Sequence, residues 1–98
     1  MDTAKRKQLR AIGHKLKPVV MIAERGVTEG VEAELERALD DHELIKVKLA
    51  ILEPEDRKLV TRHLCDSHKA ELVQSIGKVI LLYRAAKKPN PRLSNLLR

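Results

Sequence analysis

The sequence is poor in aromatic residues: Tyr83 is the only one, and tryptophan and phenylalanine are absent. Modules that recognise single-stranded nucleic acid commonly stack the bases on several aromatic side chains. A single tyrosine does not supply such a platform, so this class of module is disfavoured. The core must instead be built from aliphatic side chains, and 98 residues suffice for one modest core and one domain.

Cysteines and long apolar runs are also scarce. Cys65 is the only cysteine, so the chain cannot form an intramolecular disulfide. The longest apolar runs, residues 19–23 and 79–83, have five residues each, whereas a membrane-spanning helix needs roughly 20. The basic N-terminus is not followed by the apolar segment of a secretory signal. We therefore expect a cytoplasmic, unprocessed protein without a transmembrane segment.

Acidic residues are missing from the C-terminal part of the chain and nearly missing from its beginning. Residues 1–17 carry six Lys or Arg and one acid, and residues 72–98 carry six and none, whereas residues 18–71 carry eight against thirteen acids. If both ends lie near one surface, they form a patch that attracts polyanions. Composition alone is equally compatible with a basic surface that is exposed to solvent and binds no polyanion.

Hydrophobic spacing predicts three helices and four strands in the order α-β-α-β-α-β-β. The predicted helices span residues 3–16, 28–41 and 53–67, and the predicted strands span residues 19–22, 44–49, 72–76 and 79–83. Thr3 and Thr28 are the expected N-caps, and Gly77-Lys78 is the expected two-residue hairpin turn. These elements indicate an α/β sandwich of two or three layers around one four-stranded mixed sheet.

Charged side chains recur on single faces of these elements. The first helix carries an apolar stripe of Leu9, Ile12 and Leu16 beside a basic stripe of Lys7, Arg10, His14 and Lys17. In the second strand, Lys46 and Lys48 face away from Ile45, Val47 and Leu49. The second helix is expected to turn Val31, Leu35, Ala38 and Leu39 inward and Glu29, Glu32, Glu36 and Asp40 outward.

The stretch VVMIAERGVTEGV, residues 19–31, places a charged loop directly before a helix N-terminus. A helix start carries a partial positive charge and unsatisfied N–H groups, which together favour an anion. Gly26 would let a phosphate approach the backbone, and Arg25 could supply charge-assisted hydrogen bonds. The sequence therefore predicts an anion site at Arg25, Gly26 and Thr28. The alternative is that Gly26 only allows the chain to turn and binds no anion.

Residues that could carry catalysis or bind a metal do not form a recognisable set. His63 and Cys65 project about 200° apart on a helix, and Cys65 with His68 gives only two of the four ligands that a structural zinc needs. We expect a partly buried thiol and surface histidines. The cluster at residues 40–43 points in several directions, and no nucleophile elbow, P-loop or dinucleotide fingerprint occurs. We therefore expect no enzyme activity, no cofactor and no small-molecule substrate.

Residues 16–49, LKPVVMIAERGVTEGVEAELERALDDHELIKVKL, and residues 71–84, ELVQSIGKVILLYR, resemble the CRM domain (chloroplast RNA splicing and ribosome maturation), specifically the stand-alone bacterial YhbY family. The resemblance covers nearly the whole chain. It implies a fold like the C-terminal domain of bacterial translation initiation factor three, RNA binding without catalysis, and association with large-subunit precursors. It also places the family's loop, which is similar to the G-x-x-G loop of KH domains, at residues 23–26, with Ala23 in place of the first glycine.

We therefore predict a monomeric protein that binds structured ribosomal RNA, with one domain at residues 1–84 and a basic, partly ordered tail at residues 85–98. The alternative is a protein-interaction adaptor that uses the acidic second helix. The predicted RNA-binding residues are Arg25, Gly26 and Thr28 in the loop, Lys46 and Lys48 on the strand, Lys7, Arg10 and Lys17 on the first helix, and Arg84, Lys87, Lys88 and Arg92 towards the C-terminus.

Overall fold

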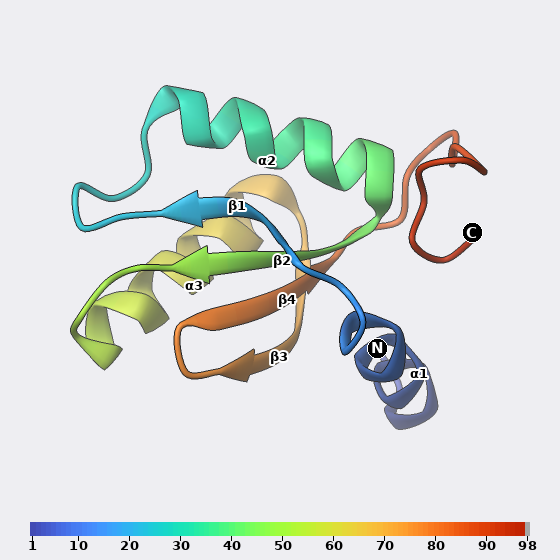
Figure 1. Cartoon of the computed structure of the whole chain (residues 1–98), viewed down its shortest axis with the longest axis horizontal. Coiled ribbons are helices and arrows are strands. Elements are labelled where there is room, and N and C mark those ends of the chain that lie inside the picture. Colours follow the sequence, from blue (N-terminus) through green and yellow to red (C-terminus); the bar gives the residue numbers. More distant parts are fainter. Residues whose placement is uncertain (98) are drawn as a thin grey trace.

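The computed structural model of the chain describes residues 1–97, so that residue 98 of the predicted tail lies outside the described residues. Its elements are α1 (Thr3–Gly13), β1 (Pro18–Ile22), α2 (Glu29–His42), β2 (Leu44–Leu49), α3 (Pro54–His68), β3 (Glu71–Ile76) and β4 (Val79–Tyr83). Their order is the predicted one (Figure 1).

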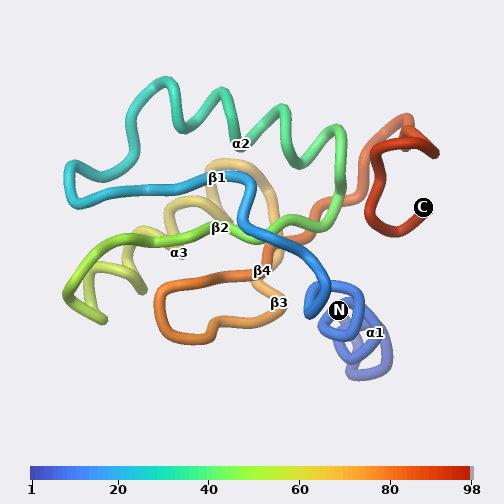
Figure 2. The backbone as a smooth tube through the Cα atoms, viewed as in Figure 1, coloured from blue at the N-terminus to red at the C-terminus, as the bar shows by residue number. Residues whose placement is uncertain are grey.

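The four strands form one mixed sheet in the order β1-β2-β4-β3. β1 is parallel to β2, with α2 as the crossover, and the other neighbours are antiparallel. The predicted four-stranded mixed sheet is thus confirmed. Because β1 and β2 are parallel, their carboxyl ends meet at one end of the sheet, and the β3–β4 turn lies there too (Figure 2). At this end of the sheet, Ala50 N donates to Ile22 O at 2.7 Å and Leu49 N donates to Lys78 O at 2.6 Å. These backbone hydrogen bonds join the end of β2 to the end of β1 and to the β3–β4 turn.

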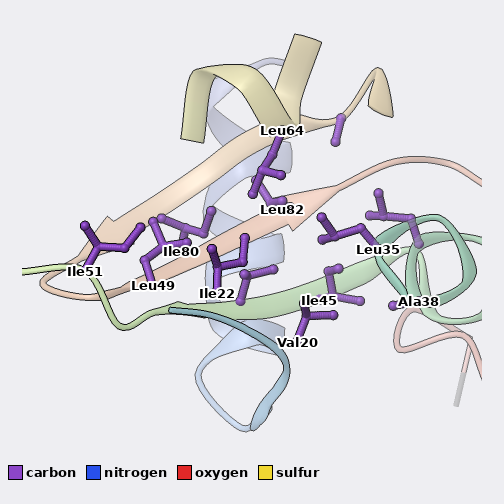
Figure 3. Close-up of a cluster of buried hydrophobic side chains, with 13 residues drawn as sticks. Val20, Ile22, Leu35, Ala38, Ile45, Leu49, Ile51, Leu64, Ile80 and Leu82 are labelled. Atoms are coloured by element: carbon purple, nitrogen blue, oxygen red, sulfur yellow. The ribbon is translucent and has the colours of Figure 1, made fainter. Parts of the chain in front are cut away.

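The main core lies between one face of the sheet and helices α2 and α3, as Figure 3 shows. Its side chains are entirely aliphatic: Val20, Ile22, Leu35, Ala38, Leu39, Ile45, Val47, Leu49, Ile51, Leu64, Ala70, Ile80 and Leu82. The alternation of each strand supplies this face, and the 3.6-residue period of each helix supplies the facing stripe. The expected absence of a large aromatic from this core follows directly from the composition.

Helix α1 packs on the opposite face of the sheet and covers only part of it. The second cluster consists of Leu9, Leu44, Val73 and Leu81, against which Ile12, Leu16, Tyr83 and Leu96 pack. The sheet therefore lies between two helical layers, but the α1 layer is incomplete. Within residues 1–97, none of the helices has the length and apolar character needed to cross a membrane.

Both ends of α1 differ from the prediction. Asp2, rather than Thr3, is the N-cap, since its carboxylate accepts a hydrogen bond from Lys5 N at 2.7 Å and its charge suits the helix dipole. The helix ends at Gly13 instead of continuing towards Lys17. Gly13 packs so closely on Leu81 that a Cβ placed there would lie 2.5 Å from Leu81 Cδ2. Apolar periodicity cannot reveal such a contact between distant residues.

The C-terminal segment folds back onto the domain, whereas the sequence predicted a partly ordered arm. Ser94 is fully buried and donates its hydroxyl to Glu43 Oε1 at 2.8 Å, and Ala86 N donates to Glu43 Oε2 at 2.9 Å. Asn95 N donates to His42 O at 3.0 Å. Glu43 is itself buried, so its carboxylate requires these donors, and the donors come from residues about fifty positions away. The division of the chain at residue 84 stays a prediction.

Candidate nucleic-acid interface

The loop between β1 and α2 is a tight turn that leads into a capped helix. Gly26 N donates to Ala23 O at 2.8 Å, and Gly26 has a φ of 86°, a conformation that favours glycine. Ala23 lies outside the positive-φ region, so its side chain causes no backbone strain. Thr28 is the N-cap, as predicted, and its hydroxyl oxygen accepts a hydrogen bond from Val31 N at 3.2 Å. The backbone thus presents Gly26 just before the helix start.

The two charged residues of this turn have different surroundings. Glu24 faces the loop between β2 and α3, where its Oε1 accepts a hydrogen bond from Leu52 N at 2.6 Å. Arg25 is exposed and makes no hydrogen bond or ion pair within residues 1–97. The positive charge beside Gly26 is therefore unneutralised, while the negative charge is already engaged with a backbone N–H.

The face of the sheet that α1 leaves open carries both lysines of β2. Strand pairing aligns Met21 with Lys48, Lys48 with Val79, and Val79 with Ile76. Met21 and Ile76 are 61% and 66% exposed, so this row is an accessible surface in which a cation lies between apolar side chains. The predicted orientation of Lys48, away from the core, is confirmed.

Lys46 lies where β2 meets the end of α1. It shares a cavity of about 190 Å³ with Lys17, and a neighbouring cavity of about 210 Å³ with His14. The fold therefore brings together the basic features that the sequence had placed on the first helix and the second strand. Lys78 is a further exposed cation, in the turn at the Gly26 end of the sheet. The sequence pattern predicts Lys78 only as a turn residue, although a lysine in a hairpin next to a basic strand is a usable signal for an extended basic surface.

Helix α1 is anchored by two of its cations and exposes others. Arg6 Nη1 donates to Leu72 O at 2.7 Å and Val73 O at 3.0 Å, and Lys5 Nζ lies 5.2 Å from the centroid of the Tyr83 ring. The basic stripe predicted from the spacing is exposed along its length: Lys7, Arg10, His14 and Lys17. Arg6 is thus half-buried and bonded to β3, whereas Lys5 and the stripe face solvent.

The acidic stripe of α2 faces outward as predicted, but Glu32, Glu36 and Asp40 also have partners within the protein. Glu36 Oε1 lies 2.7 Å from His68 Nδ1, and Glu32 Oε1 lies 3.3 Å from His68 Nε2 and 3.4 Å from His63 Nε2. His68 is only 5% exposed, so the prediction of a surface histidine is wrong for this residue. Helical spacing does not reveal that the end of α3 packs alongside this stripe and supplies its partners.

Arg84 belongs to the same network. Its Nη1 donates to Glu36 Oε1 at 2.9 Å, and its Nη2 donates to Asp40 Oδ1 at 2.8 Å. The bonds to Arg84 and His68 hold the pKa of Glu36 below its usual value. Burial acts to lower the pKa of Arg84, but its bond with Glu36 and the charges of Glu36 and Asp40 outweigh burial and raise it. The Arg84 guanidinium is therefore already bonded to two acids of α2.

The predicted tail residues lie on the α2 and α3 side of the sheet. Arg84, Lys87 and Lys88 line a cavity of about 740 Å³ together with side chains of α2 and the end of α3. Lys87, Lys88 and Arg92 are exposed. This surface is on the opposite side of the sheet from Lys46, so the single basic patch expected from both chain ends is instead two surfaces.

Cys65 is half-buried, and burial and then the charge of Asp66 raise the pKa of its thiol. The two histidines considered with it, His63 and His68, contact glutamates of α2 instead. Within the described part of the chain, no group of three or more His, Cys, Asp or Glu side chains could hold a metal ion.

Comparison with known proteins assigns these features to a family. The model of the CRS1 / YhbY (CRM) domain matches residues 1–84. The chain belongs to this family. A "Probable RNA-binding protein" of Pseudomonas aeruginosa is 59% identical over 93 residues, which are 95% of this chain and 89% of that protein. An "RNA-binding protein" of Haemophilus influenzae is 41% identical over 95% of this chain and 94% of its own length.

A solved structure also matches this CRM-family chain. The solution structure of a hypothetical protein from Staphylococcus aureus superimposes with a TM-score of 0.77 at 32% identity and covers 90% of this chain and 93% of that one. The family recognised from the sequence is thus confirmed, and the arrangement of three helices around a mixed sheet is shared with a solved protein.

Proposed function

We propose that this CRM-family protein binds structured ribosomal RNA in the cytoplasm, as a monomer, during assembly of the large ribosomal subunit. Its family membership and its relatives, which are named RNA-binding proteins, support an RNA ligand. The link to the large subunit rests on the resemblance of the sequence to the stand-alone YhbY family.

The observation that carries the proposal is the uneven neutralisation of charge. The acids of α2 that face α3 are paired with His68 and Arg84. The cations of the loop, the open sheet face and α1 have no such partners within residues 1–97, and all except the half-buried Lys46 are exposed: Arg25, Lys46, Lys48, Lys78, Lys7, Arg10 and Lys17. Exposed cations such as Arg37, Arg62 and Lys69 also occur on or next to α2 and α3, but these helices carry most of the acids of the chain. A polyanion is therefore attracted chiefly to the side of α1 and the open sheet face.

The mode of binding follows from the geometry. One phosphate would lie at Gly26 and Arg25, close to the N–H groups that begin α2 behind Thr28. Lys46 and Lys48 would track the RNA backbone across the open sheet face, and the cations of α1 would extend this contact. With one aromatic residue in the chain, recognition would depend on phosphate positions and RNA shape rather than on base stacking. Because Arg84 is occupied, we assign it a structural role and retain Lys87 and Lys88 as the tail contacts.

Equilibrium binding to structured ribosomal RNA fragments across a salt series tests the proposal, with duplex DNA of equal length for comparison. We expect tighter binding to RNA and a steep loss of affinity with salt, by roughly 0.7 to 0.9 logarithmic units per phosphate contacted. Equal, weak binding to RNA and DNA would refute it.

A matched pair of double variants locates the surface. Replacing Lys46 and Lys48 by Gln removes two charges from the open sheet face, and replacing Lys58 and Arg62 by Gln removes two from α3. Both variants lower the formal net charge from +6 to +4. We expect only the first to reduce affinity and salt dependence strongly, and an equal loss in both would show that net charge alone governs binding.

The adaptor hypothesis relied on a free acidic helix. The contacts of Glu32, Glu36 and Asp40 with α3 and Arg84 give these acids a role inside the protein. The structure therefore favours RNA binding over this alternative.

A further inference from the structure

Leu52 is the most exposed large apolar side chain within residues 1–97, at 70%. It lies in the loop between β2 and α3, at the same end of the sheet as the loop that contains Gly26 (Figure 2). A leucine in a solvent-exposed loop gains free energy by turning towards apolar neighbours. Its orientation therefore depends on how the backbone around it is held.

Charged side chains hold the Leu52 peptide on both sides. Glu24 Oε1 accepts a hydrogen bond from Leu52 N at 2.6 Å, and Arg57 Nη1 donates to Leu52 O at 2.8 Å and to Ile51 O at 2.7 Å. Hydrogen bonds to ionised groups are stronger than those between neutral groups. The fold thus fixes the backbone of Leu52 while leaving its side chain in solvent.

Glu24 also ties this leucine to the proposed phosphate site. It belongs to the turn closed by the hydrogen bond between Gly26 N and Ala23 O, and it directly precedes Arg25. A carboxylate in a phosphate-binding turn is otherwise unfavourable, because it repels the phosphate. Its bond to Leu52 N gives this acid a positive role: it joins the turn to the neighbouring loop.

We propose that Leu52 packs against the ribose and base next to the phosphate held at Arg25 and Gly26, and that Glu24 is the residue that positions it. The proposal rests on the proposed function and adds an apolar subsite to it. An aliphatic side chain can cover a sugar or a base edge without requiring an aromatic ring, which this chain lacks beyond Tyr83. Such a contact adds affinity without releasing counterions.

The first test compares Leu52→Ala with Leu59→Ala, using the same ribosomal RNA fragments and salt series. Leu59 is 62% exposed on α3, so both substitutions remove the same atoms from solvent-exposed positions. We expect Leu52→Ala to weaken binding about fivefold with an unchanged salt slope, and Leu59→Ala to bind like the wild type. Melting temperatures of both variants check that the fold is kept.

The second test concerns the positioning role of Glu24. Glu24→Gln removes the charge but keeps an oxygen that can accept the hydrogen bond from Leu52 N, whereas Glu24→Ala removes both. We expect Glu24→Gln to bind RNA at least as tightly as the wild type, and Glu24→Ala to bind about fivefold more weakly than Glu24→Gln. Equal affinities of these two variants would overturn the positioning role.

The outcomes separate the two proposals. If the wild type shows no salt-dependent preference for RNA, the proposed function fails and the subsite fails with it. If the wild type binds RNA and Leu52→Ala binds equally well, only the subsite is overturned. If Leu52→Ala and Leu59→Ala weaken binding to the same extent, the effect is a general loss of apolar surface, and the subsite is again overturned.

Discussion

Gly26 allows the proposed phosphate site to be tested by charge alone, because Asn and Asp have nearly the same shape and strain the backbone at this position equally. Its φ is 86°, and a Cβ placed on it would meet nothing within 4 Å. Replacement by Asn or Asp therefore introduces backbone strain without a steric clash. These two side chains tolerate the left-handed region better than most, and we expect a loss of about 1 kcal/mol in the free energy of unfolding.

This loss of stability should be nearly the same in Gly26→Asn and Gly26→Asp. For a domain of this size it lowers the melting temperature by roughly 4–8 °C. The carboxylate of Gly26→Asp lies near the start of α2, whose dipole favours a negative charge, so this variant should be no less stable than Gly26→Asn. Thermal unfolding followed by circular dichroism measures both.

The RNA affinities of the two variants should differ. A carboxylate about 4 Å from a phosphate is repelled by about 1 kcal/mol even in water, which corresponds to about fivefold weaker binding. Fluorescence anisotropy with a labelled ribosomal RNA fragment measures this ratio, which should shrink at high salt as the charges are screened. Equal affinities of folded Gly26→Asn and Gly26→Asp would remove the turn from the RNA site.

Three further predictions concern packing, acid stability and the C-terminal segment. Gly13→Ala should lower the free energy of unfolding by about 1–3 kcal/mol, measured by urea denaturation, because its methyl group overlaps Leu81; an unchanged midpoint would contradict this. The pKa of Glu36 is lowered in the fold, so its contribution to stability is present above the ordinary glutamate pKa of 4.5 and is lost as the pH falls through the lower folded pKa. Glu36→Gln should therefore lose less stability on acidification than the wild type, and parallel pH profiles would count against the contact with Arg84. Replacing Lys87 and Lys88 by Gln keeps the docked segment and should reduce the salt slope of RNA binding by up to about two units, whereas an unaltered slope would show that these lysines do not contact RNA.

Local patterns were sufficient to predict most of the fold. The N-cap at Thr28, the alternation of β2 and the turn at Gly77-Lys78 each depend on neighbouring residues, and each element was predicted within a few residues of its observed bounds. The end of α1 was placed too late, since the apolar spacing continues to Leu16 whereas the helix ends at Gly13, where the chain packs closely on the distant Leu81. Long-range packing is invisible to a short periodic window.

The candidate site was predictable only in part, for the same reason. The spacing of Lys46 and Lys48 predicted that both lie on the face of β2 turned away from the main core. The position of Gly26 just before a helix start predicted the turn between β1 and α2. Neither pattern indicated that His68 and Arg84 would contact the acids of α2, because those partners come from other elements. Nor could a single sequence show that Glu24 reaches across to the Leu52 peptide, since the two residues are 28 positions apart.

The position of the chain ends relative to the loops has a practical consequence. Helix α1 and the segment that follows β4 lie at the opposite end of the molecule from the loop between β1 and α2 and the loop between β2 and α3 (Figure 1). A fluorophore, purification tag or surface tether attached at either end would therefore leave the loop end accessible. Immobilised protein would present that end outward, whereas the cations of α1 and Lys87 and Lys88 would lie near the tether, so RNA affinities should be measured with the protein free in solution.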